Sequence, residues 1–139
     1  MEHPLNVLVT GAHGFVGRAL CARLSSEPQR YMLKRASSRE MAEPGCCHID
    51  LSIESDWRSV LLGVDVLVHL AALVHGRDDR TAKAFVNHAQ INTQGTLCLA
   101  RQAAEAGVRR FVFVSTIKVL GEQTTSGHVF FAQSPADPR

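Results

Sequence analysis

The sequence predicts an α/β fold, built as a doubly wound parallel sheet with the strand order 3-2-1-4-5. Apolar runs without polar interruption, typical of strands buried on both faces, alternate along the chain with segments of helical periodicity. The first apolar run stops at a glycine-rich turn that leads directly into a helical pattern. We expect right-handed crossovers that place helices on both faces of the sheet.

The composition is that of an ordinary globular protein. The 139 residues suffice for one domain with a substantial core, and 45% of them are hydrophobic and 20% charged. A formal net charge of +2 is too small to indicate binding to nucleic acid or to a membrane surface. The N-terminus leads into a core strand without a signal-peptide pattern, and no apolar run approaches the roughly 20 residues that span a bilayer.

The cysteines and histidines predict neither disulfides nor a metal site. Cys21, Cys46, Cys47 and Cys98 lack C-x-x-C spacing, which favours a reducing cytoplasm. The seven histidines are scattered without the spacing of metal ligands. We therefore expect a cytoplasmic protein without disulfides or bound metal.

Residues 5–20 form the most informative stretch, a strand, a turn and the start of a helix. Gly11, Gly14 and Gly17 follow the spacing G-x-x-G-x-x-G. The first glycine allows a tight turn, the second lets a pyrophosphate approach the backbone, and the third lets the helix pack against the strand. The free N–H groups and the positive end of the helix dipole would face the phosphates. This pattern predicts a Rossmann-type dinucleotide site; the alternative is a glycine-rich turn without a ligand.

The remaining elements alternate along the chain. The helix that begins at the glycine turn ends near residues 25–28, and loop 36–45 contains at most one helical turn. Further strands are expected over 30–35, 46–49, 64–70 and 109–115, and further helices over 53–62 and 79–106. Residues 121–139 are polar apart from 129–131, and their abrupt end predicts a chain cut before the rest of the sheet and a substrate domain.

Five motifs in a fixed order resemble the extended short-chain dehydrogenase/reductase family over essentially the whole chain. They lie at residues 10–17, 50–51, 69–72, 92–96 and 113–121. The most similar part of the family is the NAD-dependent epimerase/dehydratase group that acts on nucleotide sugars, of the UDP-glucose 4-epimerase type. The resemblance implies an NAD(P)-binding Rossmann domain over 1–120 and an incomplete active-site loop segment over 121–139.

The resemblance also implies which residues bind the cofactor. Besides the three glycines, His13, Phe15 and Val16 belong to the glycine turn, and Leu70, Ala71 and Ala72 line the cofactor. Asp50 would accept a hydrogen bond from the adenine amino group, with Leu51 packed on the ring; the alternative for Asp50 is a helix cap or a turn. Asn92 would support the active-site strand from behind. His69 is expected to point into the fold and is not assigned a catalytic role.

Two hydroxyl groups at the end of the fifth strand are the catalytic candidates. Aligning residues 119–121 with the family's Val-Tyr-Gly places the catalytic hydroxyl on Thr116, with Ser115 beside it. Such a hydroxyl can hydrogen-bond to the reacting sugar oxygen and help to carry a proton; a serine in a tight turn is the alternative for Ser115. Residues 115–122 resemble a subgroup associated with bacterial surface-polysaccharide biosynthesis.

The chain lacks the Tyr-x-x-x-Lys pair on which the family's chemistry depends. Its single tyrosine, Tyr31, has no lysine four residues later. We therefore expect residues 1–139 alone to be inactive. The resemblance implies that the full-length protein acts on a nucleotide sugar, such as a UDP-sugar, and forms a homodimer through helix 79–106 and the helix that follows. The alternatives are a keto-sugar or carbonyl reductase of the same family and a non-catalytic dinucleotide-sensing module.

The end of the second strand leaves the choice of cofactor open. NAD enzymes usually carry a carboxylate there for the ribose hydroxyls, whereas this chain has Lys34 and Arg35. Basic side chains can pair with a 2′-phosphate, which favours NADP. The resemblance favours NAD, so the sequence predicts NAD or NADP.

Overall fold

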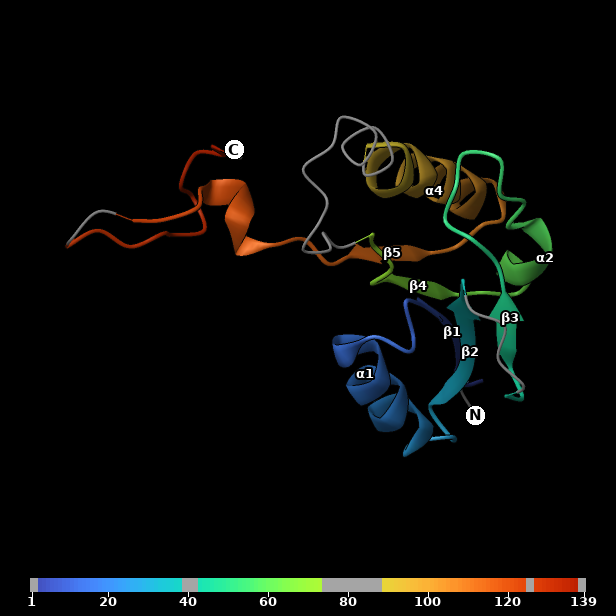
Figure 1. The fold of residues 1–139 in the computed structure, drawn as a ribbon. Helices are drawn as coiled ribbons and strands as arrows, with labels where there is room; N and C mark the ends of the chain where they lie inside the picture. The colour runs from blue at the N-terminus through green and yellow to red at the C-terminus, as the bar shows by residue number, and fades with distance from the viewer. Residues whose placement is uncertain (1–2, 39–42, 74–88, 125–126, 138–139) are drawn as a thin grey trace.

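The computed structural model describes residues 3–38, 43–73, 89–124 and 127–137, and it contains the predicted sheet. Five strands pair in parallel in the order β3-β2-β1-β4-β5, which confirms the fold class (Figure 1). The strands are β1 (Leu5–Thr10), β2 (Tyr31–Ser37), β3 (Cys46–His48), β4 (Val66–His69) and β5 (Arg110–Phe113). All five therefore end at the same edge of the sheet, where open α/β folds bind ligands.

Helices cover both faces of the sheet. Helix α1 (Phe15–Ser25) lies on one face, and α2 (Arg58–Leu61) and α4 (Thr96–Glu105) lie together on the other (Figure 1). Side chains alternate across β1, so Val7 and Val9 pack on the α1 side while Leu8 packs on the α2–α4 side. Each face thus has its own apolar core, with Cys21 in the first and Trp57 in the second.

The elements differ from the sequence predictions mainly at their ends. Strand β2 continues to Ser37, two residues beyond the predicted end, and the helix predicted over 53–62 is formed only at Arg58–Leu61. Of the long helix predicted over 79–106, residues 79–88 lie outside the described residues. Its described part begins as the π-helix η1 (Ala89–Gly95) and continues as α4, where a continuous α-helix was expected.

The segment after β5 extends away from the sheet. It forms the 3₁₀-helix η2 (Ile117–Leu120) and an irregular stretch beyond it (Figure 1). The Asp137 N–H donates to the Val119 carbonyl at 3.0 Å, so this stretch returns to η2. In the described segments, every helix is too short or too polar to reach across a lipid bilayer.

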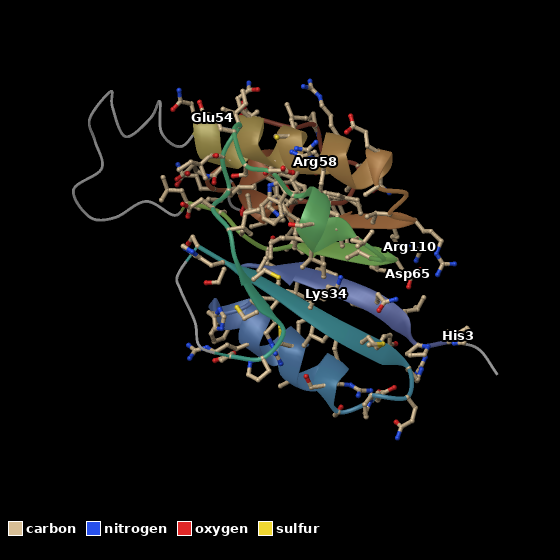
Figure 2. The ribbon with its side chains drawn as sticks, turned by 90° about the vertical axis from the view of Figure 1, so that its right-hand side faces the viewer. His3, Lys34, Glu54, Arg58, Asp65 and Arg110 are labelled. Atoms are coloured by element: carbon tan, nitrogen blue, oxygen red, sulfur yellow. The ribbon has the colours of Figure 1, made fainter. Side chains whose placement is uncertain are left out.

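At the edge where the strands begin, polar and charged side chains connect neighbouring strands. The Asp65 carboxylate, just before β4, accepts from the backbone N–H of Asn6 at 2.9 Å and from its side-chain amide at 3.3 Å. The Arg109 guanidinium, just before β5, donates to the same carboxylate at 3.1 Å. Figure 2 shows Asp65 near Arg110 at this edge. These contacts connect β1, β4 and β5 at the end of the sheet opposite the carboxyl ends of the strands.

Candidate cofactor-binding site

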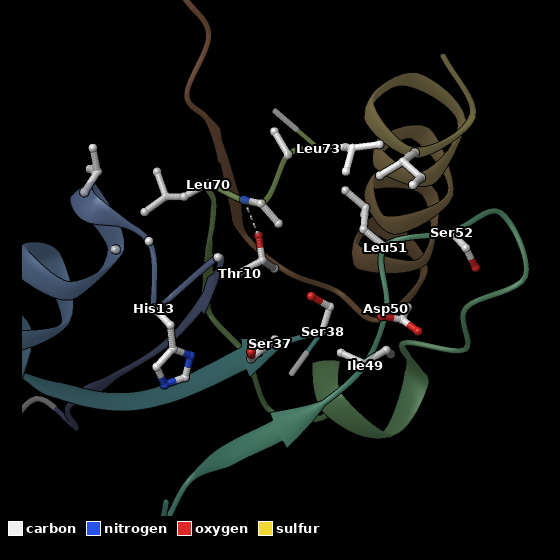
Figure 3. Close-up of a pocket in the computed structure, with 18 of the residues that line it drawn as sticks. Thr10, His13, Ser37, Ser38, Ile49, Asp50, Leu51, Ser52, Leu70 and Leu73 are labelled. Atoms are coloured by element: carbon white, nitrogen blue, oxygen red, sulfur yellow. Dashed lines mark hydrogen bonds between the residues drawn. The ribbon is translucent and has the colours of Figure 1, made fainter. Parts of the chain in front are cut away.

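A cavity of about 820 Å³ opens at the carboxyl edge of the sheet (Figure 3). Its size lies in the range of small-molecule and cofactor sites. The glycine turn, the ends of β2 and β3, and the loop after β4 form its walls. The lining residues are Thr10, Gly11, His13, Gly14, Phe15, Val16, Gly17, Ala36, Ser37, Ser38, Ile49, Asp50, Leu51, Ser52, Trp57, Leu70, Ala71, Ala72, Leu73 and Ile91. The structure therefore brings together most of the cofactor residues expected from the sequence.

The glycine turn is packed so closely at Gly11 and Gly17 that a side chain is excluded at both positions. Gly11 has φ +67°, and its carbonyl accepts from the Gly14 N–H at 3.0 Å. A Cβ on Gly17 would lie 2.2 Å from the Gly11 carbonyl oxygen, and one on Gly11 would lie 2.7 Å from the Ala71 nitrogen. The turn thus holds α1, β1 and the loop after β4 at backbone contact distance.

The N-terminus of α1 is open toward this cavity. Gly14 is its N-cap, no side chain caps the helix, and its first turn has no acidic residue. The first N–H groups of a helix have no partner within the helix and favour anions. Phe15 and Val16, at the first two positions of α1, are 93% and 53% exposed. The turn therefore fits a phosphate-bearing ligand that also covers apolar surface.

His13 occupies the wall between the glycine turn and the loop before β3. Its Nε2 lies 3.4 Å from the Glu43 carboxylate, while its Nδ1 is buried without a hydrogen-bond partner in the described structure. The ring lines the cavity, as expected for a residue of the glycine turn.

Lys34 and Arg35 do not line the cavity. The Lys34 ammonium donates to the Leu62 carbonyl at 2.7 Å, at the end of α2, and Figure 2 shows its position on β2. The Arg35 guanidinium lies 3.4 Å from the Pro44 carbonyl and 3.4 Å from the Ser25 hydroxyl. At the end of β2, Ala36, Ser37 and the following Ser38 line the cavity instead. None of the three was assigned to the site from the sequence.

The strand register accounts for this difference. Thr10 pairs with Ala36, so the residue after Ala36 lies beside the first glycine of the turn. Because the strand was predicted to end at Arg35, its basic residues were assigned to the position that Ser37 occupies. The two serines are identified only once this register is known, because the basic residues by themselves do not give it.

At the far end of the cavity, Asp50 and Leu51 follow β3 as expected (Figure 3). The Asp50 carbonyl accepts a hydrogen bond from the Ser55 hydroxyl, which fixes the backbone of this loop. Leu51 packs against Gly95, where an added Cβ would lie 3.1 Å from the leucine Cγ. This contact brings the π-helix η1 close to the cavity.

Asn92 does not line the cavity, but it supports the loop that forms one of its walls. Its side-chain oxygen accepts from the Leu73 N–H at 2.7 Å, and its amide donates to the Leu73 carbonyl at 2.9 Å. The neighbouring Ile91 lines the cavity instead. Asn92 therefore fixes the end of the loop that contains Leu70, Ala71 and Ala72.

His69 is buried beneath the cavity, with 1% of its surface exposed. Its Nδ1 lies 2.7 Å from the Thr10 hydroxyl and its Nε2 2.9 Å from the Thr96 hydroxyl. The rings of Phe111 and Phe113 lie 5.9 and 6.0 Å from it, centre to centre. Burial lowers the pKa of His69 to about 4, so the imidazole is neutral near pH 7. The side chain points into the fold, as the sequence predicted.

Ser115 and Thr116 lie beyond the end of β5 and are exposed. The Val114 N–H donates to the His69 carbonyl at 3.3 Å, at the end of β4. Ser115 and Thr116, the next two residues of the chain, therefore lie close to the end of β4. Thr116 caps η2 by accepting from the Lys118 N–H at 3.3 Å. Neither residue is part of the cavity lining.

Tyr31 pairs with Leu5 at the start of the sheet, at the edge opposite the cavity. The single tyrosine of the chain therefore cannot serve as a proton acceptor at this site. Among the described residues, no group of three or more histidine, cysteine or acidic side chains is arranged to hold a metal ion.

Comparison with known proteins gives the family. The model of the NAD dependent epimerase/dehydratase family matches residues 7–139. The UDP-glucose 4-epimerase of Vibrio cholerae is 36% identical over 130 residues, which cover 91% of this chain and 39% of the epimerase. A short-chain dehydrogenase/reductase superfamily protein from Agrobacterium tumefaciens, solved with bound NAD, matches with a TM-score of 0.81 and 28% identity. That match covers 96% of this chain and 39% of the Agrobacterium tumefaciens protein.

A second solved structure includes a nucleotide sugar. MoeE5 in complex with UDP-glucuronic acid and NAD matches with a TM-score of 0.80 and 27% identity, over 96% of this chain and 43% of MoeE5. The chain thus spans about two fifths of the length of these proteins. With its Rossmann-like sheet and a family match over nearly its whole length, the chain belongs to the NAD dependent epimerase/dehydratase family.

Proposed function

We propose that the cavity at the carboxyl edge binds NAD or NADP. The glycine turn and the uncapped N-terminus of α1 would hold the pyrophosphate. Ser37, Ser38, Asp50 and Leu51 would surround the adenosine, because they line the end of the cavity beyond the turn. The observation that carries the proposal is this cavity of about 820 Å³, which joins the glycine turn to the ends of β2 and β3.

A nicotinamide cofactor supplies hydride transfer when bound. In this chain, Leu70, Ala71 and Ala72 would line it, while Ser115 and Thr116 would hydrogen-bond to a reacting oxygen beside the end of β4. Residues 1–120 would form the cofactor-binding unit, and residues 121–139 would belong to an active-site loop. The 139 residues contain no Tyr-x-x-x-Lys sequence, so we expect cofactor binding without turnover by this chain.

We infer that the full-length protein is an epimerase or dehydratase acting on a nucleotide sugar, such as a UDP-sugar. The family match and the UDP-glucose 4-epimerase relative support this substrate class, as does the complex of MoeE5 with UDP-glucuronic acid.

One observation favours a second candidate, an NADP-dependent reductase of the same family. The end of β2 presents the hydroxyl side chains of Ser37 and Ser38 to the cavity instead of a carboxylate. A 2′-phosphate would therefore meet no like charge from these two positions. Measuring the dissociation constants of NAD and NADP side by side distinguishes the two candidates.

The test is isothermal titration of the purified chain with each cofactor, together with a Gly14→Ala variant. Gly14 has φ −70° and ψ 175°, which alanine also adopts, and the added Cβ would lie 3.3 Å from the Gly11 carbonyl oxygen. The fold should tolerate this methyl group, but it would occupy the surface that the pyrophosphate approaches. We expect the dissociation constant to rise by at least about tenfold, a loss of about 1.4 kcal/mol.

Gly63→Ala provides the control, because it adds the same methyl group at the opposite edge, with no atom within 4 Å. Its φ of +71° adds left-handed backbone strain of about 1 kcal/mol, which affects stability but lies away from the cavity. It should leave cofactor affinity unchanged. Failure of the unaltered chain to bind either cofactor at millimolar concentration, or equal effects of the two substitutions, would contradict the proposal.

A further inference from the structure

We infer that His69 is a positioning residue of the cofactor site. Held in one tautomer between two threonine hydroxyls, it fixes the loop 70–73 at its distance from the glycine turn. The inference rests on the proposed function, because it assigns His69 a role in forming the walls of the cofactor cavity.

The tautomer follows from counting protons in the network. The Ala71 N–H donates to the Thr10 hydroxyl oxygen at 3.3 Å (dashed in Figure 3). The single hydroxyl proton of Thr10 then needs an acceptor, and within the described structure the group in reach is His69 Nδ1, at 2.7 Å. Nδ1 therefore accepts, the ring carries its proton on Nε2, and Nε2–H donates to the Thr96 hydroxyl at 2.9 Å.

The surroundings of the ring favour this single arrangement. His69 is 1% exposed and lies beside Phe111 and Phe113, which offer no hydrogen bonds. A second proton on the ring would place an N–H against the Thr10 hydroxyl and would have no carboxylate to balance its charge among these contacts. The network is thus complete only with a neutral Nε2–H imidazole.

The network connects three elements that meet beneath the cavity. Thr10 ends β1, His69 ends β4, and Thr96 begins α4. On the same helical segment, four residues before Thr96, Asn92 binds both backbone groups of Leu73. The loop after β4 is therefore held at its start through Thr10 and at its end through Asn92.

The glycine turn leaves this loop no room to shift toward it. A Cβ on Gly11 would lie 2.7 Å from the Ala71 nitrogen and 2.8 Å from the Leu70 carbonyl carbon. The side on which the loop can move is away from the turn, and the bonds through Thr10, His69 and Thr96 oppose that movement. Breaking them should widen the cavity between Gly11 and Ala71 and weaken cofactor binding.

The first experiment determines the tautomer in the unaltered chain. Long-range ¹H–¹⁵N correlation spectra at pH 7.5 should show His69 with a protonated Nε2 and an unprotonated Nδ1. The opposite tautomer, or a mixture of the two, would overturn the proton arrangement and with it the inference.

The second experiment measures NAD affinity in variants of the network. His69→Phe retains an aromatic ring but removes both hydrogen bonds, and we expect it to raise the dissociation constant by at least about tenfold. Thr96→Val removes the bond to Nε2 without changing a cavity-lining residue, and it should raise the constant about threefold. Thr96→Ser restores a hydroxyl at this position and should restore the affinity of the unaltered chain.

A core substitution separates positioning from general loss of stability. Val60→Ala destabilises the apolar core between the sheet and α2–α4 without touching the network, so it should lower the melting temperature and leave NAD affinity unchanged. If His69→Phe folds and binds NAD with unchanged affinity, this inference is wrong while the proposed function stands. If His69→Phe does not fold, unchanged affinity in both Thr96 variants has the same consequence. Failure of the unaltered chain to bind both NAD and NADP would overturn the proposed function together with this inference.

Discussion

Different kinds of side chain connect the strands at the two edges of the sheet. Where the strands begin, the charged Asp65 and Arg109 join β4 and β5, and Asp65 also binds Asn6 of β1. The Arg109 side chain there is 67% exposed. Where the strands end, the neutral side chains of Thr10, His69 and Thr96 join β1, β4 and α4, and His69 is 1% exposed.

The difference between a charged and a neutral edge agrees with the position of the cavity, which lies only at the neutral one. Charged pairs in water hold two strands together weakly, because solvent screens them and both side chains lose freedom. A buried neutral network defines positions more closely, and it places no carboxylate beneath a cavity suited to an anionic pyrophosphate. We therefore expect substitutions at the carboxyl edge to change both stability and cofactor binding, and those at the opposite edge to change stability slightly.

The largest expected effect comes from adding a methyl group to the turn at the carboxyl edge. In Gly17→Ala the new Cβ would lie 2.2 Å from the Gly11 oxygen and 2.8 Å from Ala12 backbone atoms. Because backbone must move, we expect a loss of at least about 3 kcal/mol in unfolding free energy. NAD binding should be lost as well. Urea denaturation and calorimetric titration measure the two effects.

Gly107→Ala is the matching change where β5 begins. Gly107 has φ +79° and nothing within 4 Å of an added Cβ, so the cost is the left-handed backbone strain of about 1 kcal/mol. NAD affinity should stay the same. Equal losses of stability in the two variants would show that the turn is not the more constrained of the two glycine positions.

A second prediction concerns the pH dependence of the buried histidine. Burial lowers the pKa of His69 from 6.5 to about 4, so the unfolded chain binds the proton more tightly than the folded chain. The resulting stability is fully present above pH 6.5 and is lost as the pH falls toward 4, up to about 3 kcal/mol in all. Urea denaturation at half-unit steps from pH 7.5 to 4.5 measures this slope.

The opposite edge should respond in a different pH range. Hydrogen bonds from Asn6 and the Arg109 charge lower the pKa of Asp65 from 3.8, so its contribution is present above pH 3.8 and is lost below it. His69→Phe should therefore remove the slope between pH 6.5 and 4.5, whereas Asp65→Asn should leave that slope unchanged. A slope that persists in His69→Phe would mean that another group titrates there.

The sequence was sufficient for the glycine turn, which depends on local spacing. It was also sufficient for the strand order, because alternating strand and helix patterns with right-handed crossovers predict a doubly wound sheet. Gly11, Gly14 and Gly17 line the cavity at the positions the spacing predicted. The direction of the Lys34 and Arg35 side chains could not be predicted, because it depends on the register of β2 against β1 and on partners 28 and 10 residues away in the chain. The π-helical winding at Ala89–Gly95 has no periodic signal of its own, since the apolar steps fit an α-helix equally well.

A third prediction places a charge at the end of β2, where Ser37 and Ser38 line the cavity without one. Ser37 lines the cavity beside the first glycine of the turn, where a carboxylate would accept from ribose hydroxyls and repel a 2′-phosphate. We expect Ser37→Asp to raise the ratio of the NADP to the NAD dissociation constant by at least about tenfold. Titration with both cofactors measures it, with Ser37→Asn as the uncharged control. An unchanged ratio would show that the adenosine ribose does not lie at the end of β2.

The smallest expected effect is at the charged edge. The Arg109 guanidinium lies 3.1 Å from the Asp65 carboxylate, but its side chain is 67% exposed, so Arg109→Gln should cost less than about 1 kcal/mol of unfolding free energy. Because water and salt already screen the pair, 0.5 M NaCl should shrink even this difference. NAD affinity should not change, since the pair lies at the edge away from the cavity. A loss as large as that of Gly17→Ala would mean that the charged edge, and not the neutral network, determines the stability of the sheet.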